Sequence, residues 1–75
     1  MTTGLDIKTG LRKEIGRELK LFRKQKRLSQ IVLAKQMGVS RSTLSKIENG
    51  KFSISIDYLE KFSVHLGFKV KLLKN

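Results

Sequence analysis

The chain has 75 residues, no cysteine and a single histidine, and seventeen Lys and Arg against six Asp and Glu give it a formal net charge of +11 at pH 7. The absence of cysteine excludes disulfides, thiolate zinc sites and a cysteine nucleophile, and one histidine, His65, excludes a histidine-rich metal site. A charge this basic in a small domain favours a polyanionic partner, either nucleic acid or an anionic membrane surface.

Length and hydropathy further limit the kind of protein that this sequence can encode. A core built from 75 residues normally contributes only about 3–5 kcal/mol of stability, so we expect a second copy of the chain to add to it. No uncharged run approaches the roughly 20 residues that span a bilayer, and residues 1–10 lack the apolar core of a signal peptide. We therefore expect a cytoplasmic protein.

Apolar residues at helical spacing predict an amphipathic first helix from Leu11 to about Lys26, with basic residues between them. Its expected buried stripe consists of Leu11, Ile15, Leu19 and Phe22. Gly16 lies within this stretch and costs about 1 kcal/mol relative to alanine, which close packing against another element would explain. Residues 1–10 are predicted to form an N-terminal arm.

A second helix of about two turns is predicted from Gln30 to Met37, because Ser29 is a favourable N-cap and Gly38 is a favourable residue just after a helix. Its expected buried side consists of Ile31, Leu33, Ala34 and Met37. Val39 is then expected to enter the core.

A third helix is predicted from Arg41 to Asn49, capped by Ser40 and closed by Gly50. Two short helices that meet at a brief turn containing glycine are typical of the helix-turn-helix unit. At about 100° per residue, one arc of the third helix carries only hydrogen-bonding side chains, those of Arg41, Ser42, Ser45, Lys46 and Asn49. The opposite side carries Thr43, Leu44, Ile47 and Glu48.

That polar arc suits a helix lying in the major groove of DNA. Arg and Lys can bond guanine O6 and N7, and serine hydroxyls can bond either donors or acceptors on base edges. Side chains near the helix start reach deepest, so the base-reading candidates are Arg41, Ser42, Ser45 and Lys46. Gln30, at the positive end of the second helix, and Lys51, just after the third, are candidates for binding phosphate. A polar helix face is often merely solvated, and it is the net charge of +11 that favours DNA reading.

A fourth helix is expected to start after its N-cap Ser55 and to end at Gly67. Its expected buried residues are Ile56, Leu59, Phe62 and either Val64 or Leu66.

The last segment, residues 68–75, changes its hydrophobic period. Phe68, Val70 and Leu72 alternate with Lys69 and Lys71, which predicts a β-strand with one apolar face. A lone strand in a helical chain has unpaired N–H and C=O groups, which makes it a template for another strand.

Several segments resemble, in order and spacing, the Cro/C1-type (XRE) helix-turn-helix family of phage repressors and bacterial regulators. The segments are "R..K.LSQ", "LA..MGVS", "STLSKIENGK" and "SIDYLEKF", within residues 21–67. The resemblance implies an all-α, lambda-repressor-like bundle of four to five helices in residues 11–67, which binds operator DNA as a homodimer. The proline that family members often carry before the fourth helix is absent here, which implies a slightly less rigid loop.

The resemblance also assigns roles to individual residues. The base-contacting positions of the family fall on Arg41, Ser42, Ser45 and Lys46. The positions that contact the DNA backbone fall on Gln30, Thr43, Asn49 and Lys51. The internal ion pair of the family falls on Arg23 and Glu48, which makes Glu48 structural. The C-terminal "FKVKLL" resembles the HipB-type antitoxin branch, in which the strand pairs with its two-fold mate and Phe68, Val70 and Leu72 serve dimerisation.

The leading hypothesis is a nucleoid-associated, sequence-specific transcriptional repressor that binds a palindromic operator as a homodimer. Two roles remain open within it. One is the autoregulating antitoxin of a HipBA-like type II toxin–antitoxin system, which binds a HipA-like toxin kinase. The other is a free-standing phage- or plasmid-type repressor with no toxin partner.

Two other function classes are disfavoured. Membrane binding by the basic first helix is disfavoured because the helix has no tryptophan and its apolar stripe is needed in the core. An enzyme is not expected, because Ser29, Ser40 and Ser55 are explained as caps and no acid–base pair remains. No cofactor or metal is expected.

Overall fold

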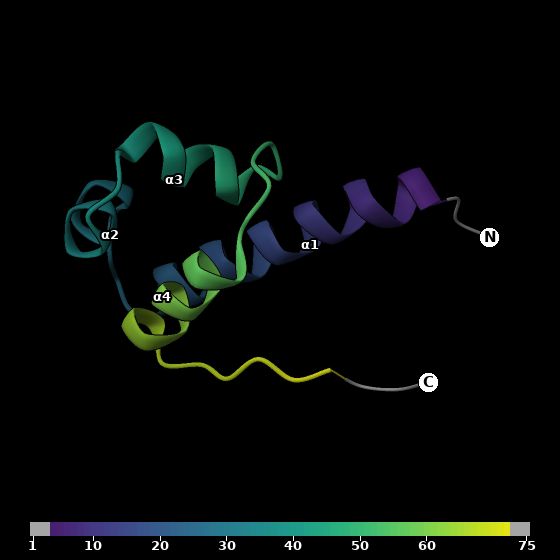
Figure 1. Ribbon diagram of the computed structural model, residues 1–75. Coiled ribbons are helices and arrows are strands. Elements are labelled where there is room, and N and C mark those ends of the chain that lie inside the picture. The colour runs from purple at the N-terminus through teal and green to yellow at the C-terminus, as the bar shows by residue number, and fades with distance from the viewer. Residues whose placement is uncertain (1–3, 73–75) are drawn as a thin grey trace.

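The computed structural model describes the backbone of residues 4–72 and the side chains of residues 10–72. The described residues form four helices: α1 (Gly4–Gln25), α2 (Gln30–Met37), α3 (Arg41–Glu48) and α4 (Ile56–Leu66). Figure 1 shows α2, α3 and α4 gathered around the C-terminal half of α1, whose N-terminal half extends beyond the bundle. The predicted all-α bundle is confirmed for this part of the chain. Within it, no helix is both long enough and apolar enough to cross a membrane.

The first helix begins at Gly4 and not at the predicted Leu11, so residues 4–10 of the expected arm belong to α1. Gly10, which reads as a helix boundary in the sequence, lies inside the helix with open space around it. A glycine inside a helix costs about 1 kcal/mol relative to alanine, and the cooperative extension of a 22-residue helix tolerates that cost. Residues 1–3 of the expected arm lie outside the described residues.

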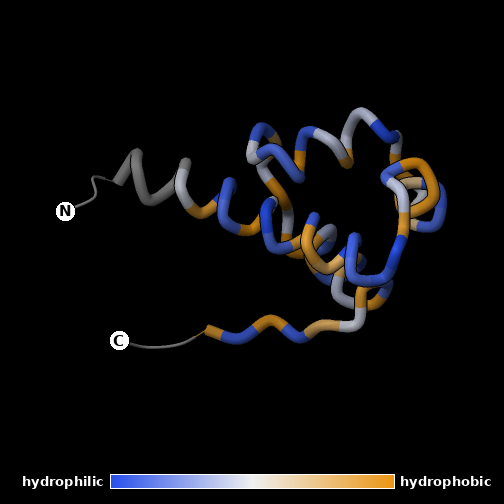
Figure 2. Tube along the Cα trace, turned by 180° about the vertical axis from the view of Figure 1, so that it is seen from behind, coloured by the Kyte–Doolittle hydropathy of each residue, from blue (hydrophilic) through white to orange (hydrophobic). Residues whose placement is uncertain are grey.

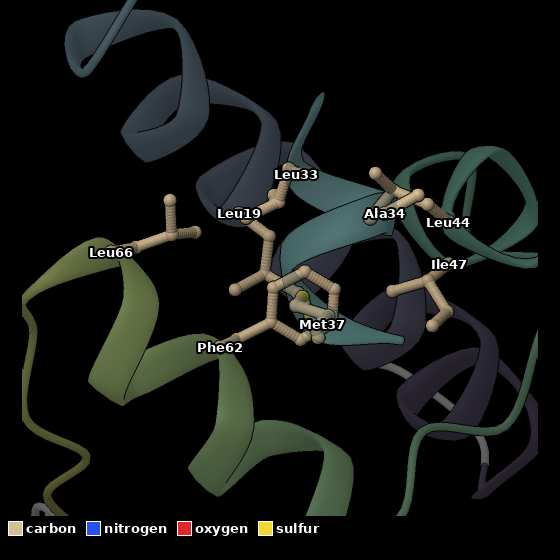
Figure 3. Close-up of a cluster of buried hydrophobic side chains, with 8 residues drawn as sticks. All are labelled: Leu19, Leu33, Ala34, Met37, Leu44, Ile47, Phe62 and Leu66. Carbon is tan, nitrogen blue, oxygen red and sulfur yellow. The ribbon is translucent and has the colours of Figure 1, made fainter. Parts of the chain in front are cut away.

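The core is a cluster of buried apolar side chains to which all four helices contribute (Figure 3). Its members are Leu19, Leu33, Ala34, Met37, Leu44, Ile47, Phe62 and Leu66. Burial of a Leu or Phe side chain contributes about 1.5–3 kcal/mol, so this cluster supplies the main driving force for the fold. Val39 packs against the cluster, as predicted.

Four apolar residues that the sequence placed in the core are exposed, namely Leu11, Ile31, Ile56 and Val64. Leu11 of α1 is 53% exposed and lines a hollow beside the C-terminal segment. Ile31 and Val64 are each two residues from a buried side chain, which places them about 200° around their helices from it. Ile56 is the first residue of α4 and is 84% exposed, because it lies at the edge of the buried face.

Helices α1 and α3 approach closely at Gly16. A Cβ atom at this position would lie 2.5 Å from the carbonyl oxygen of Ile47 and 2.6 Å from that of Glu48. Real Cβ atoms do not come this close to backbone, so only glycine fits between the two helices. The close packing expected at Gly16 is confirmed.

The predicted helix starts at α2, α3 and α4 are confirmed by their caps. The side chains of Ser29, Ser40 and Ser55 each accept a hydrogen bond from a backbone N–H in the first turn of the helix that follows. At the other end, α2 is closed by Gly38 with a φ of 71° in the left-handed region, where glycine is favoured. Helix α3 ends at Glu48 with Asn49 as C-cap, one residue before the predicted end.

The segment Phe68–Leu72 follows α4 without helical structure, and Figure 2 shows apolar and basic residues alternating along it. It forms no strand with the other described residues, because a strand is defined by hydrogen bonds to a neighbour and residues 4–72 offer none. The predicted pairing with a second chain therefore stays a prediction. Residues 73–75 of the predicted strand lie outside the described part of the chain.

Candidate nucleic-acid interface

The exposed face of α3 carries a shallow hollow of about 430 Å³. Its lining residues are Arg41, Ser42, Ser45, Lys46, Asn49 and Lys51. The four predicted base-reading residues and two of the predicted phosphate-binding residues therefore share one surface. All of these residues are polar or basic, and none is acidic, so the hollow suits a negatively charged ligand.

The opposite face of α3 fixes the helix in the bundle. Leu44 and Ile47 are buried in the core, and Glu48, which follows Ile47, is 4% exposed. A carboxylate at this depth needs hydrogen-bonding partners, since an isolated buried charge is very costly. The structure supplies those partners from two other helices.

Arg23 of α1 meets Glu48 in a two-pronged ion pair. The Arg23 Nε atom lies 2.7 Å from Glu48 Oε2, and the other contact, from Nη2 to Oε1, is 3.0 Å. The Arg23 Nη1 atom also donates to the Leu28 carbonyl oxygen at 2.8 Å. Arg23 thereby joins α1 and the α1–α2 connection to the buried face of α3, and the Arg23 and Glu48 charges both have hydrogen-bonding partners.

Gln30, the first residue of α2, contacts the same carboxylate. Its Nε2 atom donates to Glu48 Oε1 at 2.9 Å. Helices α1, α2 and α3 are thus tied together through Glu48, and no described buried side-chain nitrogen or oxygen lacks a hydrogen-bond partner. Gln30 also lies at the positive end of α2, where the first N–H groups have no partner inside the helix.

The remaining predicted contact residues of α3 make local hydrogen bonds. Thr43 is half-buried, and its hydroxyl lies 2.9 Å from that of the N-cap Ser40. Asn49 folds back along α3, because its Nδ2 atom donates to the Ser45 carbonyl oxygen at 2.9 Å. These hydrogen bonds hold both side chains against α3, and of the two only Asn49 lines the hollow.

One basic residue near the hollow was not singled out from the sequence. Gly50 has a φ of 72°, and a Cβ there would lie 2.7 Å from Lys13 Cγ, so the stem of Lys13 packs directly on this turn. Lys13 of α1 is therefore adjacent to the residue before Lys51. No local pattern predicts this contact, since it depends on how α1 passes beneath the end of α3.

Three exposed acids lie on another part of the surface. Glu14 and Glu18 line a hollow beside α1, and Glu60 lines another beside α4, both shared with residues after Gly67. The charge is thus divided between a basic α3 surface and a surface that contains carboxylates. Among the described residues, no group of three or more His, Asp or Glu could hold a metal ion.

Comparison with known proteins identifies the architecture. A helix-turn-helix family model matches residues 19–73, which include the whole α2–α3 unit. The chain belongs to the helix-turn-helix family. In this family member, the two short capped helices and the turn at Gly38 are the segment that gives the family its name.

Curated relatives include regulators of several kinds. The chain is 37% identical over 62 residues to the ImmF control region 10 kDa protein of Bacillus phage phi105, covering 83% of this chain and 69% of that protein. It is 44% identical over 62 residues to the HTH-type transcriptional regulator SinR of Bacillus licheniformis, covering 81% and 56%. It is 39% identical over 54 residues to Antitoxin PezA of Streptococcus pneumoniae, covering 67% of this helix-turn-helix chain and 34% of PezA.

Proposed function

We propose that this helix-turn-helix protein is a sequence-specific transcriptional repressor that binds an operator with inverted-repeat half-sites as a homodimer. The observation that carries the proposal is the hollow on α3, where Arg41, Ser42, Ser45 and Lys46 lie together and no acid intervenes. Bound at its operator, the protein would repress by occluding a promoter.

Arg41 is the principal base-reading residue in this proposal. It is exposed at the first position of α3, where side chains of a recognition helix reach base edges. Its guanidinium suits the O6 and N7 atoms of guanine, and we expect one guanine in each half-site. Ser42, Ser45 and Lys46 would read neighbouring bases.

Gln30, Thr43, Asn49 and Lys51 bind phosphate in this proposal. Gln30 and the free N–H groups at the start of α2 would meet one strand, while Asn49 and Lys51 at the end of α3 would meet the backbone further along. These contacts set the orientation of α3 in the groove and add affinity that is independent of sequence.

The homodimer in this proposal forms through the C-terminal segment, where Phe68, Val70 and Leu72 would pair with the same residues of a second chain as a two-stranded sheet. Two recognition helices related by a two-fold axis would then enter successive major grooves about 34–36 Å apart. A small core also gains stability from such an association.

The test is selection of binding sites from a random DNA duplex pool with the full chain, followed by titrations across salt concentrations. The proposal expects an inverted repeat with half-sites about one helical turn apart. Enrichment of no sequence, with an affinity that simply collapses as salt rises, would mean that the charge binds DNA and α3 does not read it.

A role as the antitoxin of a toxin–antitoxin pair is a second candidate, favoured by the antitoxin among the relatives. In that case the folded surface would also bind a toxin, of which a HipA-like kinase is the expected type. Co-expression with a neighbouring toxin gene tests it: the antitoxin role expects rescue of growth and a stable complex. Growth arrest that the chain does not relieve would leave the free-standing repressor.

A further inference from the structure

The segment Phe68–Leu72, here called the tail, runs over the seam between α1 and α4. Figures 1 and 2 show it leaving α4 and passing beside α1 towards the N-terminal end of that helix. A hollow of about 610 Å³ lies between the tail and α4, and one of about 390 Å³ lies between the tail and α1. We call these two hollows together the tail groove.

The tail is anchored only at its start. The ring of Phe68 packs on that of Phe22, with centroids 5.1 Å apart. Beyond it, Val70 is 55% exposed and Leu72 is 98% exposed. In the described part of the chain, residues 69–72 make no backbone–backbone hydrogen bond. Exposed apolar side chains and backbone polar groups without a backbone partner therefore occur together along the four residues 69–72.

The walls of the tail groove add further exposed apolar surface. Leu11 of α1 is 53% exposed on one side of the tail, and Ile56 of α4 is 84% exposed on the other. Scattered exposed apolar residues are ordinary, whereas a continuous apolar patch with a polar edge marks an interaction surface. The tail groove is of the second kind.

The edge of the tail groove carries both signs of charge. Glu14 and Glu18 line the α1 side, and the tail contributes Lys69 and Lys71 to the same hollow. Within residues 10–72 no ion pair joins any of these four side chains. A surface that carries an acidic rim next to an unpaired basic segment is complementary to itself, which a two-fold interface requires.

The carboxylates also disfavour some classes of ligand in the tail groove. DNA and anionic lipid are both polyanions, and the tail groove offers them no net positive charge, since its three glutamates outnumber its two lysines. We infer that the occupant is a second copy of this chain, whose tail brings Lys69 and Lys71 onto Glu14 and Glu18 of the first copy. This inference rests on the homodimer of the proposed function and assigns its contacts.

The test is a charge exchange between two chains. A rim variant carries Glu14→Lys and Glu18→Lys, and a tail variant carries Lys69→Glu and Lys71→Glu. Each variant alone is expected to dimerise about tenfold or more weakly than the wild type, because the two-fold axis repeats every repulsion. Sedimentation equilibrium of the full chain measures the dissociation constants.

Mixing the two variants is the decisive step. In a mixed dimer, the rim lysines of one chain face the tail glutamates of the other, which reverses the charges at that contact. At the second contact, the unchanged rim glutamates face the unchanged tail lysines, so both contacts join opposite charges. We expect the mixed dimer to form within about twofold of the wild-type affinity. Pairing of each tail with its own rim would give no recovery on mixing, since both variants repel themselves internally.

A matched control separates this effect from general attraction. The variant Lys20→Glu/Lys24→Glu has the same net charge as the tail variant, and neither residue lines the tail groove. By itself it should dimerise like the wild type, because its rim and tail are unchanged. Its mixed dimer with the rim variant has one native and one repulsive contact, and should therefore be weaker than the mixed dimer of the rim and tail variants. A control mixed dimer that is as strong, or no recovery with the tail variant, would overturn the assigned contacts.

The outcome for the wild type separates this inference from the proposed function. A wild type that dimerises and selects an inverted repeat, with variants that dimerise equally well, would overturn the rim contacts and leave the repressor proposal standing. A wild type that is monomeric both free and on selected DNA would overturn the homodimer and this inference together.

Discussion

Replacing Arg23 with Met should nearly unfold the protein, because it leaves a buried carboxylate without its ion-pair partner. The Glu48 side chain is 1% exposed, and Arg23→Met removes both of its guanidinium contacts, leaving only the Gln30 amide. Removing one partner of a buried ion pair costs about 3–5 kcal/mol. A domain of this size has roughly that much stability in total, so the folded fraction should fall steeply at 25 °C.

A double variant isolates the cause. Arg23→Met combined with Glu48→Leu removes both charges and fills the site with apolar atoms, and such exchanges are often neutral or stabilising. We expect the double variant to recover most of the lost free energy of unfolding. Lys24→Met, an exposed change on the same helix, should alter it by no more than about 0.5 kcal/mol.

The assay is urea denaturation followed by helical circular dichroism at one fixed protein concentration, since association would raise the apparent stability. A loss below about 1 kcal/mol for Arg23→Met would refute the reasoning. So would a double variant as unstable as the single one, because the cost would then lie in lost packing and not in the unpaired carboxylate.

Three further predictions follow from the interface and the packing. Arg41→Ala should weaken operator binding by about 1–3 kcal/mol and relax base choice at one position per half-site, in gel-shift titrations with single-base operator variants; unchanged preference would exclude Arg41 as a base reader. Lys51→Gln should weaken binding to all sequences alike and reduce the slope of log affinity against log salt by about 0.9 per subunit, whereas Lys24→Gln should not; equal slopes for the two variants would remove Lys51 from the phosphate contacts. Gly16→Ala should lower the melting temperature, since its methyl group would lie 2.5 Å from a backbone oxygen, while Gly10→Ala should raise stability by about 0.5–1 kcal/mol; similar melting temperatures for both would contradict the close packing at Gly16.

Local signals in the sequence predicted the ends of the short helices well. Serine caps and a glycine in the left-handed region act through atoms one to four residues away, so Ser29, Ser40 and Ser55 could be assigned without knowing the fold. The same local reasoning gave a wrong helix start at Gly10, because a glycine is also tolerated inside a helix when its neighbours favour helix extension.

Burial depended on which neighbours a helix meets, and the sequence carries that information only in part. Periodicity identified Leu33 and Phe62 correctly, yet it also assigned Ile31 and Ile56 to the core, where no element covers them. The contact of Arg23 with Glu48 was inferred from family resemblance and not from spacing, since the two residues are 25 positions apart. No sequence pattern predicted the contact of Lys13 with Gly50.

The base-reading and dimerisation roles remain predictions, although the structure groups the α3 residues around one hollow. The fold of one chain determines which side chains share a surface, whereas the bases and the second strand that they contact belong to other molecules. The tail illustrates the difference, because a β-strand exists only with a partner that completes its hydrogen bonds.

The fit of Gly16 against the end of α3 has a geometric consequence for operator choice. One side of α1 touches the backbone of α3 with no side chain between them, and another side borders the tail groove. In the proposed dimer, the thickness of a single helix therefore separates the DNA-reading surface from the subunit contact. Such a rigid spacer transmits any rotation of one subunit against the other directly to the distance between the two recognition helices. The position of α1 would therefore determine the preferred number of base pairs between the half-sites. Variants with a larger side chain at residue 16 should change that preferred spacing at a smaller side-chain size than the one that abolishes DNA binding.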